Sequence, residues 1–276
     1  MARTLTDRDR LICHYLHRHR VLTTDQIADL FFDTPALARL RLVTLYRRRL
    51  VDRFRPFRPA GSAPFHYVLG DVGAAVLAAE GGRAPTAPAP RRRQAMALQT
   101  SQHLAHLVGV NGFFTALART ARRSGGRLEL AQWWSEPQCA AAMGGLVYPD
   151  GYGLWRHGAH SIEFCLEYDR GTEPLGRLKD KLSGYVRLQA ASWVSRWTLF
   201  CFTTPRREGE AARVLTHPAV AVATTSIDRH ASNPEGPNWL PVPGNGKRAV
   251  LGALCHTSDS TASSSKFGTP EQGLCR

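Results

Sequence analysis

The sequence of 276 residues lacks the features that mark several classes of protein. It has no apolar run near the roughly 18 residues that a membrane-spanning helix needs, so no membrane partner is expected. None of its six cysteines forms a C-x-x-C pair, which argues against a zinc knuckle and is typical of reduced thiols. No secretory leader is recognisable, because Met1–Arg10 leads directly into a charged segment. The sequence therefore predicts a cytoplasmic protein.

Acidic residues are also scarce. The chain has 22 Asp and Glu against 36 Lys and Arg, and its formal net charge is +14. Such an excess predicts an acidic partner, most simply nucleic acid, and says nothing about the fold. The hydrophobic content of 43% is enough for a normal core, and the length allows two domains.

Residues 1–82 have the pattern of a winged helix-turn-helix domain that binds DNA. Three short helices are expected after threonine caps, the last running from Thr34–Pro35 to about Leu50. We expect its apolar side to consist of Leu37, Leu40, Val43 or Thr44, Leu45 and Leu50. A β-hairpin, the wing, is predicted from strands at 50–57 and 65–69, and a helix at 71–79 closes the domain.

Arginines crowd the third helix and the wing, where a winged helix contacts double-stranded DNA. The expected DNA-binding residues are Arg39, Arg41, Arg47, Arg48, Arg49, Arg53, Arg55 and Arg58. The alternative is a solvated basic face that serves protein contacts. A winged helix often forms a homodimer on a palindromic site, but no clear coiled coil is present, so the oligomeric state stays open.

The remaining chain divides into a Pro/Ala/Arg linker at 83–98, an α/β domain at 99–230, and a loop with a polar tail at 231–276. In the α/β domain the segment 160–168 alternates. Glu163, Glu167 and Asp169 lie on one side of the predicted strand, while Pro149–Asp150 ends a short apolar segment. Clustered carboxylates require a compensating cation, so Asp150, Glu167 and Asp169 form a candidate divalent-metal site. The alternative is a solvated strand face.

The predicted element order, α-β-β-β-α-β-α-β, indicates a mixed sheet flanked by helices. It resembles the restriction-endonuclease-like core, whose site follows a PD…(D/E)-x-K pattern. The resemblance implies that Asp150, Glu167 and Asp169 hold Mg²⁺ for phosphodiester cleavage. The position of the lysine holds Asp169 here, so either Lys179 or Lys181 supplies the cation, or the site has lost catalysis.

A more specific resemblance covers residues 4–225. The run at 167–173 with Lys181 and Tyr185, and the segments 5–9 and 106–111, resemble the actinobacterial replication-relaxation family. That family implies a role in the replication or relaxation of plasmids and integrative elements, and it names a context more firmly than a reaction.

Three hypotheses follow. The first is a non-catalytic DNA-binding factor of a mobile element. The second is a Mg²⁺-dependent endonuclease or nickase with catalytic residues Asp150, Glu167, Asp169 and Lys181. The third, the least favoured, is a relaxase-type enzyme with Tyr185 as nucleophile, because no histidine array of the rolling-circle type is present.

Overall fold

The computed structural model describes residues 5–57, 61–82, 97–192, 196–231 and 233–254. The chain divides into two compact units, 1–115 and 116–276, which are described separately. The division falls inside helix α6 (Leu104–Arg123), later than the sequence-predicted start of the second domain at residue 99. Most of the predicted linker (83–96) and the predicted tail from residue 255 lie outside the described residues.

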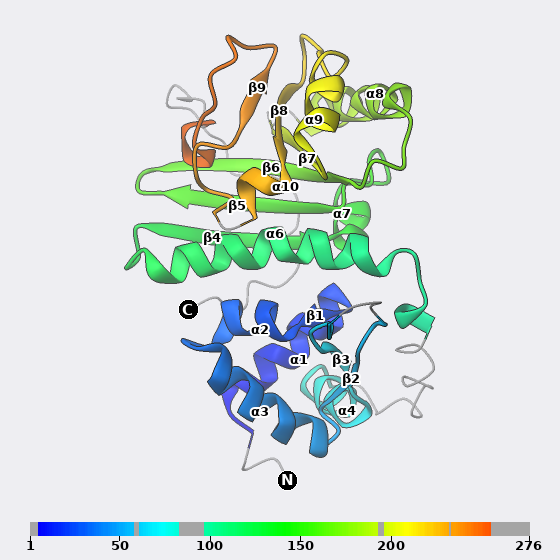
Figure 1. The fold of residues 1–276 in the computed structure, drawn as a ribbon, viewed down its shortest axis with the longest axis vertical. Helices are drawn as coiled ribbons and strands as arrows, with labels where there is room; N and C mark the ends of the chain where they lie inside the picture. The colour runs from blue at the N-terminus through cyan, green and yellow to red at the C-terminus, as the bar shows by residue number, and fades with distance from the viewer. Residues whose placement is uncertain (1–4, 58–60, 83–96, 193–195, 232, 255–276) are drawn as a thin grey trace. The chain divides into compact units, whose positions relative to one another are not determined.

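The first unit combines short helices with a small antiparallel sheet (Figure 1). Its elements are α1 (Asp7–His19), β1 (Leu22–Thr23), α2 (Thr24–Phe31), α3 (Pro35–Arg47), β2 (Val51–Phe54), β3 (His66–Leu69) and α4 (Asp71–Glu80). The strand order is β1-β3-β2. Thr6, Thr23 and Thr34 cap the three helices by accepting backbone N–H groups three residues on. The predicted helices, hairpin strands and closing helix are all present.

The apolar side of α3 differs from the prediction. Ala38, Leu42 and Leu45 face the core, whereas Leu37 and Leu40 are 51% and 71% exposed. The inward residues follow the spacing i, i+4, i+7, which puts Leu37 and Leu40 on other sides of the helix. The prediction chose the larger side chains, and the helix instead buries a small alanine at its contact with the core.

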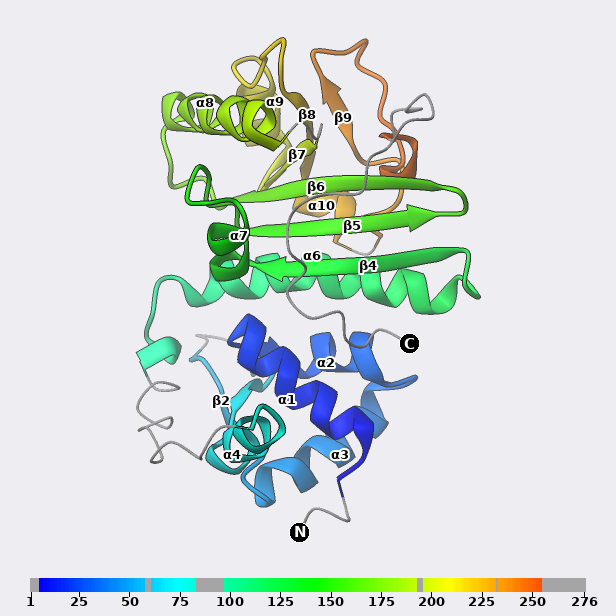
Figure 2. The same ribbon diagram turned by 180° about the vertical axis from the view of Figure 1, so that it is seen from behind.

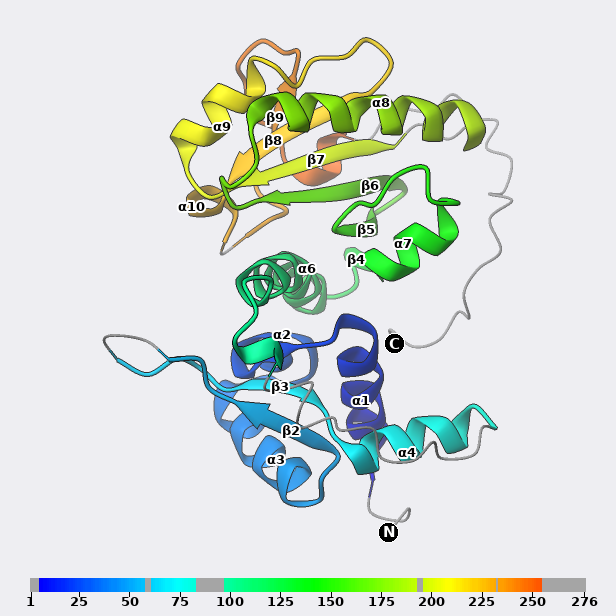
Figure 3. The same cartoon turned by 90° about the vertical axis from the view of Figure 1, so that its right-hand side faces the viewer.

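The second unit is a six-stranded mixed sheet with helices (Figures 1 and 3). After α6 come β4 (Leu128–Ser135), α7 (Glu136–Ala142), β5 (Gly151–His157), β6 (His160–Asp169), α8 (Leu175–Ser192), β7 (Trp197–Phe202), α9 (Pro205–Ala212), β8 (Ala221–Ser226), α10 (Ile227–His230), β9 (Leu240–Val242) and η2 (Leu251–Leu254). The strand order follows the chain, β4 to β9. Strands β6, β7 and β8 pair in parallel and the other neighbours pair antiparallel. The predicted mixed α/β fold is confirmed.

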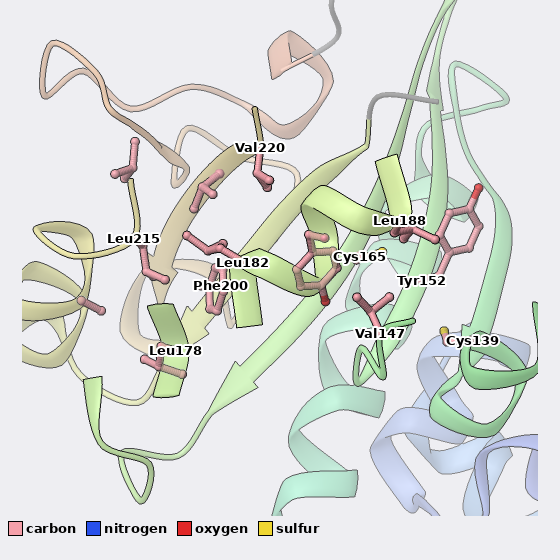
Figure 4. Close-up of a cluster of buried hydrophobic side chains, with 14 of the residues drawn as sticks. Cys139, Val147, Tyr152, Cys165, Leu178, Leu182, Leu188, Phe200, Leu215 and Val220 are labelled. Atoms are coloured by element: carbon pink, nitrogen blue, oxygen red, sulfur yellow. The ribbon is translucent and has the colours of Figure 1, made fainter. Parts of the chain in front are cut away.

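The core of the second unit lies between α8 and the sheet (Figure 4). Leu178, Leu182 and Leu188 of α8 pack in one cluster with Cys165 of β6 and Phe200 of β7. Strand β7 is central and apolar, as predicted, since β6 and β8 flank it in the sheet and its residues Leu199 to Phe202 are buried. The face of β6 that carries the carboxylates is therefore the face under α8.

Three parts of this unit were not predicted. Helix α7 lies against the ends of β4 and β5 (Figure 2), and β9 and η2 fall in a segment expected to be a loop. Strand β5 begins at Gly151, directly after Asp150. Among the described helices, none has the length and apolar character that crossing a membrane would require.

Candidate functional site

Asp150 and Glu167 are brought together by the antiparallel pairing of β5 with β6. Gly151 pairs with Leu166, so Asp150, one residue earlier, lies beside Glu167, one residue later. The Asp150 carboxylate is fixed there because its Oδ2 accepts the Tyr168 backbone N–H at 2.7 Å. Two acids that are 17 positions apart in the sequence thus lie side by side where β5 begins and β6 ends.

Glu167 is 4% exposed and is bound by two side chains of α8. Lys181 Nζ donates to Oε2 at 2.8 Å, and the Tyr185 hydroxyl donates to Oε1 at 2.5 Å. The two donors are one helical turn apart, so α8 presents both to one carboxylate. We call Asp150, Glu167, Lys181 and Tyr185 the carboxylate–lysine site.

The electrostatics of this site are those of a crowded, buried carboxylate. Burial raises the pKa of Glu167 to about 7, and the charge of Asp150 adds to the rise, while Lys181 and Tyr185 oppose it. Burial lowers the pKa of Lys181, but the attraction and hydrogen bond of Glu167 outweigh it, and the net shift is upward. Burial also raises the pKa of Tyr185. The buried Tyr185 hydroxyl therefore points to a hydrogen-bonding role and away from a nucleophilic one.

Asp169 lies on the same side of β6 as Glu167 but is bound by other groups. Its Oδ2 accepts Arg207 Nε at 2.9 Å, and its Oδ1 accepts the Gly171 N–H at 2.6 Å. Arg207 also donates to the carbonyl of Glu173, and so fastens the loop after β6 to the first turn of α9. The charge of Asp169 is thus balanced by Arg207 and not by Lys181.

The alternative of a solvated strand face is wrong at Glu167 and Asp169, because both side chains are buried. Glu167 and Asp169 are 4% and 7% exposed, and α8 and α9 supply a basic partner for each. Within the described ranges, no group of three or more His, Cys, Asp or Glu side chains is placed to hold a metal ion. Of the predicted site residues, the structure brings Asp150, Glu167 and Lys181 together. Lys179, the other lysine considered, is exposed on α8.

In the first unit, Arg41 differs from the other arginines predicted to bind DNA. Its guanidinium pairs with Asp9, which is buried in the first turn of α1, with Nε donating to Oδ1 at 2.8 Å. Burial alone would raise the pKa of Asp9, but hydrogen bonds from Arg41 and Thr6 hold it below its usual value. Arg41 is therefore committed to holding α3 against α1.

The other arginines leave a basic surface on α3 and the hairpin. Arg39 and Arg47 are exposed, Arg48 is half-buried, and Arg49 is exposed while paired with Asp71. Arg53 and Arg55 stack on aromatic rings. Arg53 Cζ lies 4.1 Å from the Phe65 ring centroid and 4.4 Å from that of Tyr46, and Arg55 Cζ lies 3.9 Å from that of Phe65. Arg58 lies outside the described residues.

Sequence reasoning missed Arg207 as a site residue. It is 38 positions from Asp169, so no local spacing links the two. The signal that could have found it is topological. Strands β6 and β7 are parallel with Asp169 opposite Phe202, so the turn after β7 and the start of α9 emerge beside Asp169.

Comparison with known proteins identifies the family of the chain. A family model described as replication-relaxation matches residues 14–197, which is more than half of the chain. No curated protein matches the chain. The chain therefore belongs to the replication-relaxation family, which suggests a role in plasmid replication or relaxation.

Proposed function

We propose that this protein binds double-stranded DNA of a plasmid or mobile element and acts there in replication or relaxation. The first unit would be the DNA-binding module. Its order of three helices followed by a hairpin is that of a winged helix, in which the third helix enters the major groove and the wing lies beside it. A cytoplasmic location is consistent with such a role.

The observation that carries this proposal is the sign of the charge on α3 and the hairpin. Helix α3 contains no acidic residue, and Arg39 and Arg47 are exposed on it. Arg53 and Arg55 on the hairpin side are oriented by stacking on Phe65. Exposed cations that line one element and its neighbour match the regular phosphates of a duplex.

Duplex binding measured by fluorescence anisotropy across a salt series tests this proposal. We expect log K to fall steeply with log salt, and Arg47→Ala to lower the slope by about 1. Arg122→Ala, which removes an exposed arginine of α6 outside the proposed surface, is the matched control and is expected to leave the slope unchanged. Absence of duplex binding at low salt would overturn the proposal.

A second candidate function is favoured by one contact, that of Lys181 with Glu167. The linear pattern has Asp169 where a nuclease of the restriction-endonuclease-like class has lysine. Lys181 reaches the carboxylate from the neighbouring helix at 2.8 Å. The second candidate is therefore a Mg²⁺-dependent DNA endonuclease or nickase, with Lys181 stabilising charge on the phosphate.

The fit to Mg²⁺ is limited to two carboxylates. Asp150 and Glu167 are adjacent, and Mg²⁺ is commonly held by one or two carboxylates together with substrate phosphates. Both oxygens of Asp169 accept hydrogen bonds from Arg207 and Gly171, so Asp169 is bound apart from this pair. Both oxygens of Glu167 also accept hydrogen bonds, from Lys181 and Tyr185, so a bound Mg²⁺ would have to displace one of these donors. When bound, Mg²⁺ would supply an activated water for attack on a phosphodiester.

Incubation with supercoiled plasmid in Mg²⁺, Mn²⁺ or EDTA separates the two candidates. Metal-dependent nicking that is lost in Asp150→Asn and Lys181→Met, and kept in Lys179→Met, would support the nuclease. A shifted plasmid band without nicking in any metal would leave the DNA-binding role alone.

A further inference from the structure

The outward side of α3 carries leucines where a DNA-reading helix usually carries polar side chains. Leu37, Leu40, Thr44 and Arg47 follow one another at i, i+3, i+7 and i+10, and we call this row the outer stripe of α3. Leu40 is 71% exposed and Leu37 is 51% exposed, while the opposite side of the helix is buried through Ala38, Leu42 and Leu45.

The chemistry of the stripe restricts what it can read. Residues 35–47 contain no Asn, Gln, Asp or Glu, so the helix has no side chain for bidentate reading of adenine or for accepting from cytosine. The hydroxyl of Thr44 donates within the helix to the carbonyl of Leu40 at 3.4 Å. What the stripe offers a base edge is aliphatic surface from Leu37 and Leu40, followed about two turns after Leu40 by the guanidinium of Arg47.

In the major groove one base carries an exposed apolar group, because only thymine has the C5 methyl. We propose that the outer stripe of α3 reads thymine methyls through Leu40 and Leu37, and that the target of the protein contains A·T pairs at these positions. The inference rests on the proposed binding of duplex DNA, and it adds the base class that the helix selects.

A second copy of the chain is the other occupant that would cover these leucines. The charges of the stripe disfavour it. In a symmetric dimer the same patch of each copy covers the other, and α3 contains no acid that could neutralise Arg47 of the other copy. A duplex neutralises Arg47 with phosphate or guanine and covers the leucines with methyl groups.

The test uses the full chain and duplexes that it selects from a random pool. Selected duplexes are synthesised with thymine or with deoxyuridine, which differ only by the methyl group. We expect wild type to bind the deoxyuridine duplex more weakly, by about fourfold for each thymine methyl that a leucine would have covered. Leu40→Ala is expected to bind the thymine duplex more weakly and to show a reduced thymine preference. Leu146→Ala, which truncates an exposed leucine of the second unit, is expected to keep the full preference.

The outcomes distinguish this inference from the proposed function. Equal binding of both duplexes by wild type, or an unchanged preference in Leu40→Ala, would overturn thymine reading and leave duplex binding in place. If the pool yields no bound duplex at low salt, the proposed function fails. A dimer in light scattering that Leu40→Ala converts to a monomer would assign the stripe to a second copy and overturn the inference.

Discussion

The ammonium of Lys181 lies 2.8 Å from Oε2 of Glu167, although the two residues are 14 positions apart on different elements. The contact neutralises a carboxylate that the sheet has buried beside Asp150. The contact therefore matters both for the stability of a fold that contains a buried acid and for whether the second unit can act on DNA. The first can be answered without DNA, by measurements of stability.

Replacing Lys181 by methionine should destabilise the second unit. The variant leaves Glu167 buried without its cation, and losing a hydrogen bond to a buried charge costs about 1–3 kcal/mol. The lower half of that range is expected, because the side chain of Lys181 is 36% exposed and water can replace part of the interaction. Urea unfolding at pH 8 measures the loss. Lys179→Met, on the exposed side of the same helix, is the control, and an equal loss in both variants would contradict a specific role for the ion pair.

Glu167 should give stability an identifiable dependence on pH. Its pKa is raised from the ordinary 4.5 to about 7, so between these values the unfolded chain has lost a proton that the folded chain keeps. The free energy of unfolding therefore falls as pH rises through this window, by at most about 3 kcal/mol from this group. The contribution is fully present below pH 4.5 and lost above about pH 7.

The variant Glu167→Gln cannot titrate, so its stability should lack this fall. The measurement is the free energy of unfolding of wild type minus that of the variant, from pH 4.5 to 8. Glu129→Gln, which changes an exposed carboxyl on β4, is the control. The free energy of unfolding of wild type minus that of this variant should not change with pH. If the free energy of unfolding of wild type minus that of Glu167→Gln does not change between pH 4.5 and 8, Glu167 is already ionised at pH 4.5 in the folded protein. The raised pKa would then be wrong.

Gly184 lets α8 approach the segment that leads into Asp150. A Cβ at this position would lie 2.9 Å from Val147 Cγ1 and 3.2 Å from the carbonyl oxygen of Leu146. Because the side chain of valine is stiff and a backbone oxygen cannot swing away, Gly184→Ala should cost about 1–3 kcal/mol in thermal unfolding. Gly176→Ala, on the same helix, meets nothing within 4 Å and should be neutral or stabilising by up to about 1 kcal/mol. The opposite order of the two variants would contradict this packing.

Much of the fold could be predicted from the sequence because its signals are local. Threonine caps, the alternation along β6 and the apolar β7 each act over a few residues. Helix α7 also had a local signal that was overlooked, the capping box between Ser135 and Gln138. The apolar side of α3 was assigned wrongly because two sides of this helix carry apolar residues at helical spacing, and the prediction chose the side of the larger Leu37 and Leu40.

The site was less accessible to sequence reasoning because its contacts are long-range. The alternation places Glu167 and Asp169 on the same side of β6 but cannot say which cation each will meet. Lys181 was considered beside Lys179, and only the placement of α8 over the sheet (Figure 3) selects between them. Arg207 was missed, since its contact with Asp169 depends on the parallel pairing of β6 with β7.

Arg41 and Arg47 should separate stability from DNA binding within one helix. Arg41→Met removes both hydrogen bonds to the buried carboxylate of Asp9, so it should destabilise the first unit by about 3 kcal/mol. Arg47→Met removes an exposed cation and should change stability by less than about 0.5 kcal/mol, while weakening duplex binding and lowering its salt slope by about 1. Urea unfolding and anisotropy on the same preparations give both quantities.

Under conditions where Arg41→Met is still folded, its salt slope should equal that of wild type, because the guanidinium it lacks is held by Asp9. A reduced slope in Arg41→Met and an unchanged one in Arg47→Met would reverse the assignment and place the phosphate contacts on the side of α3 that faces α1.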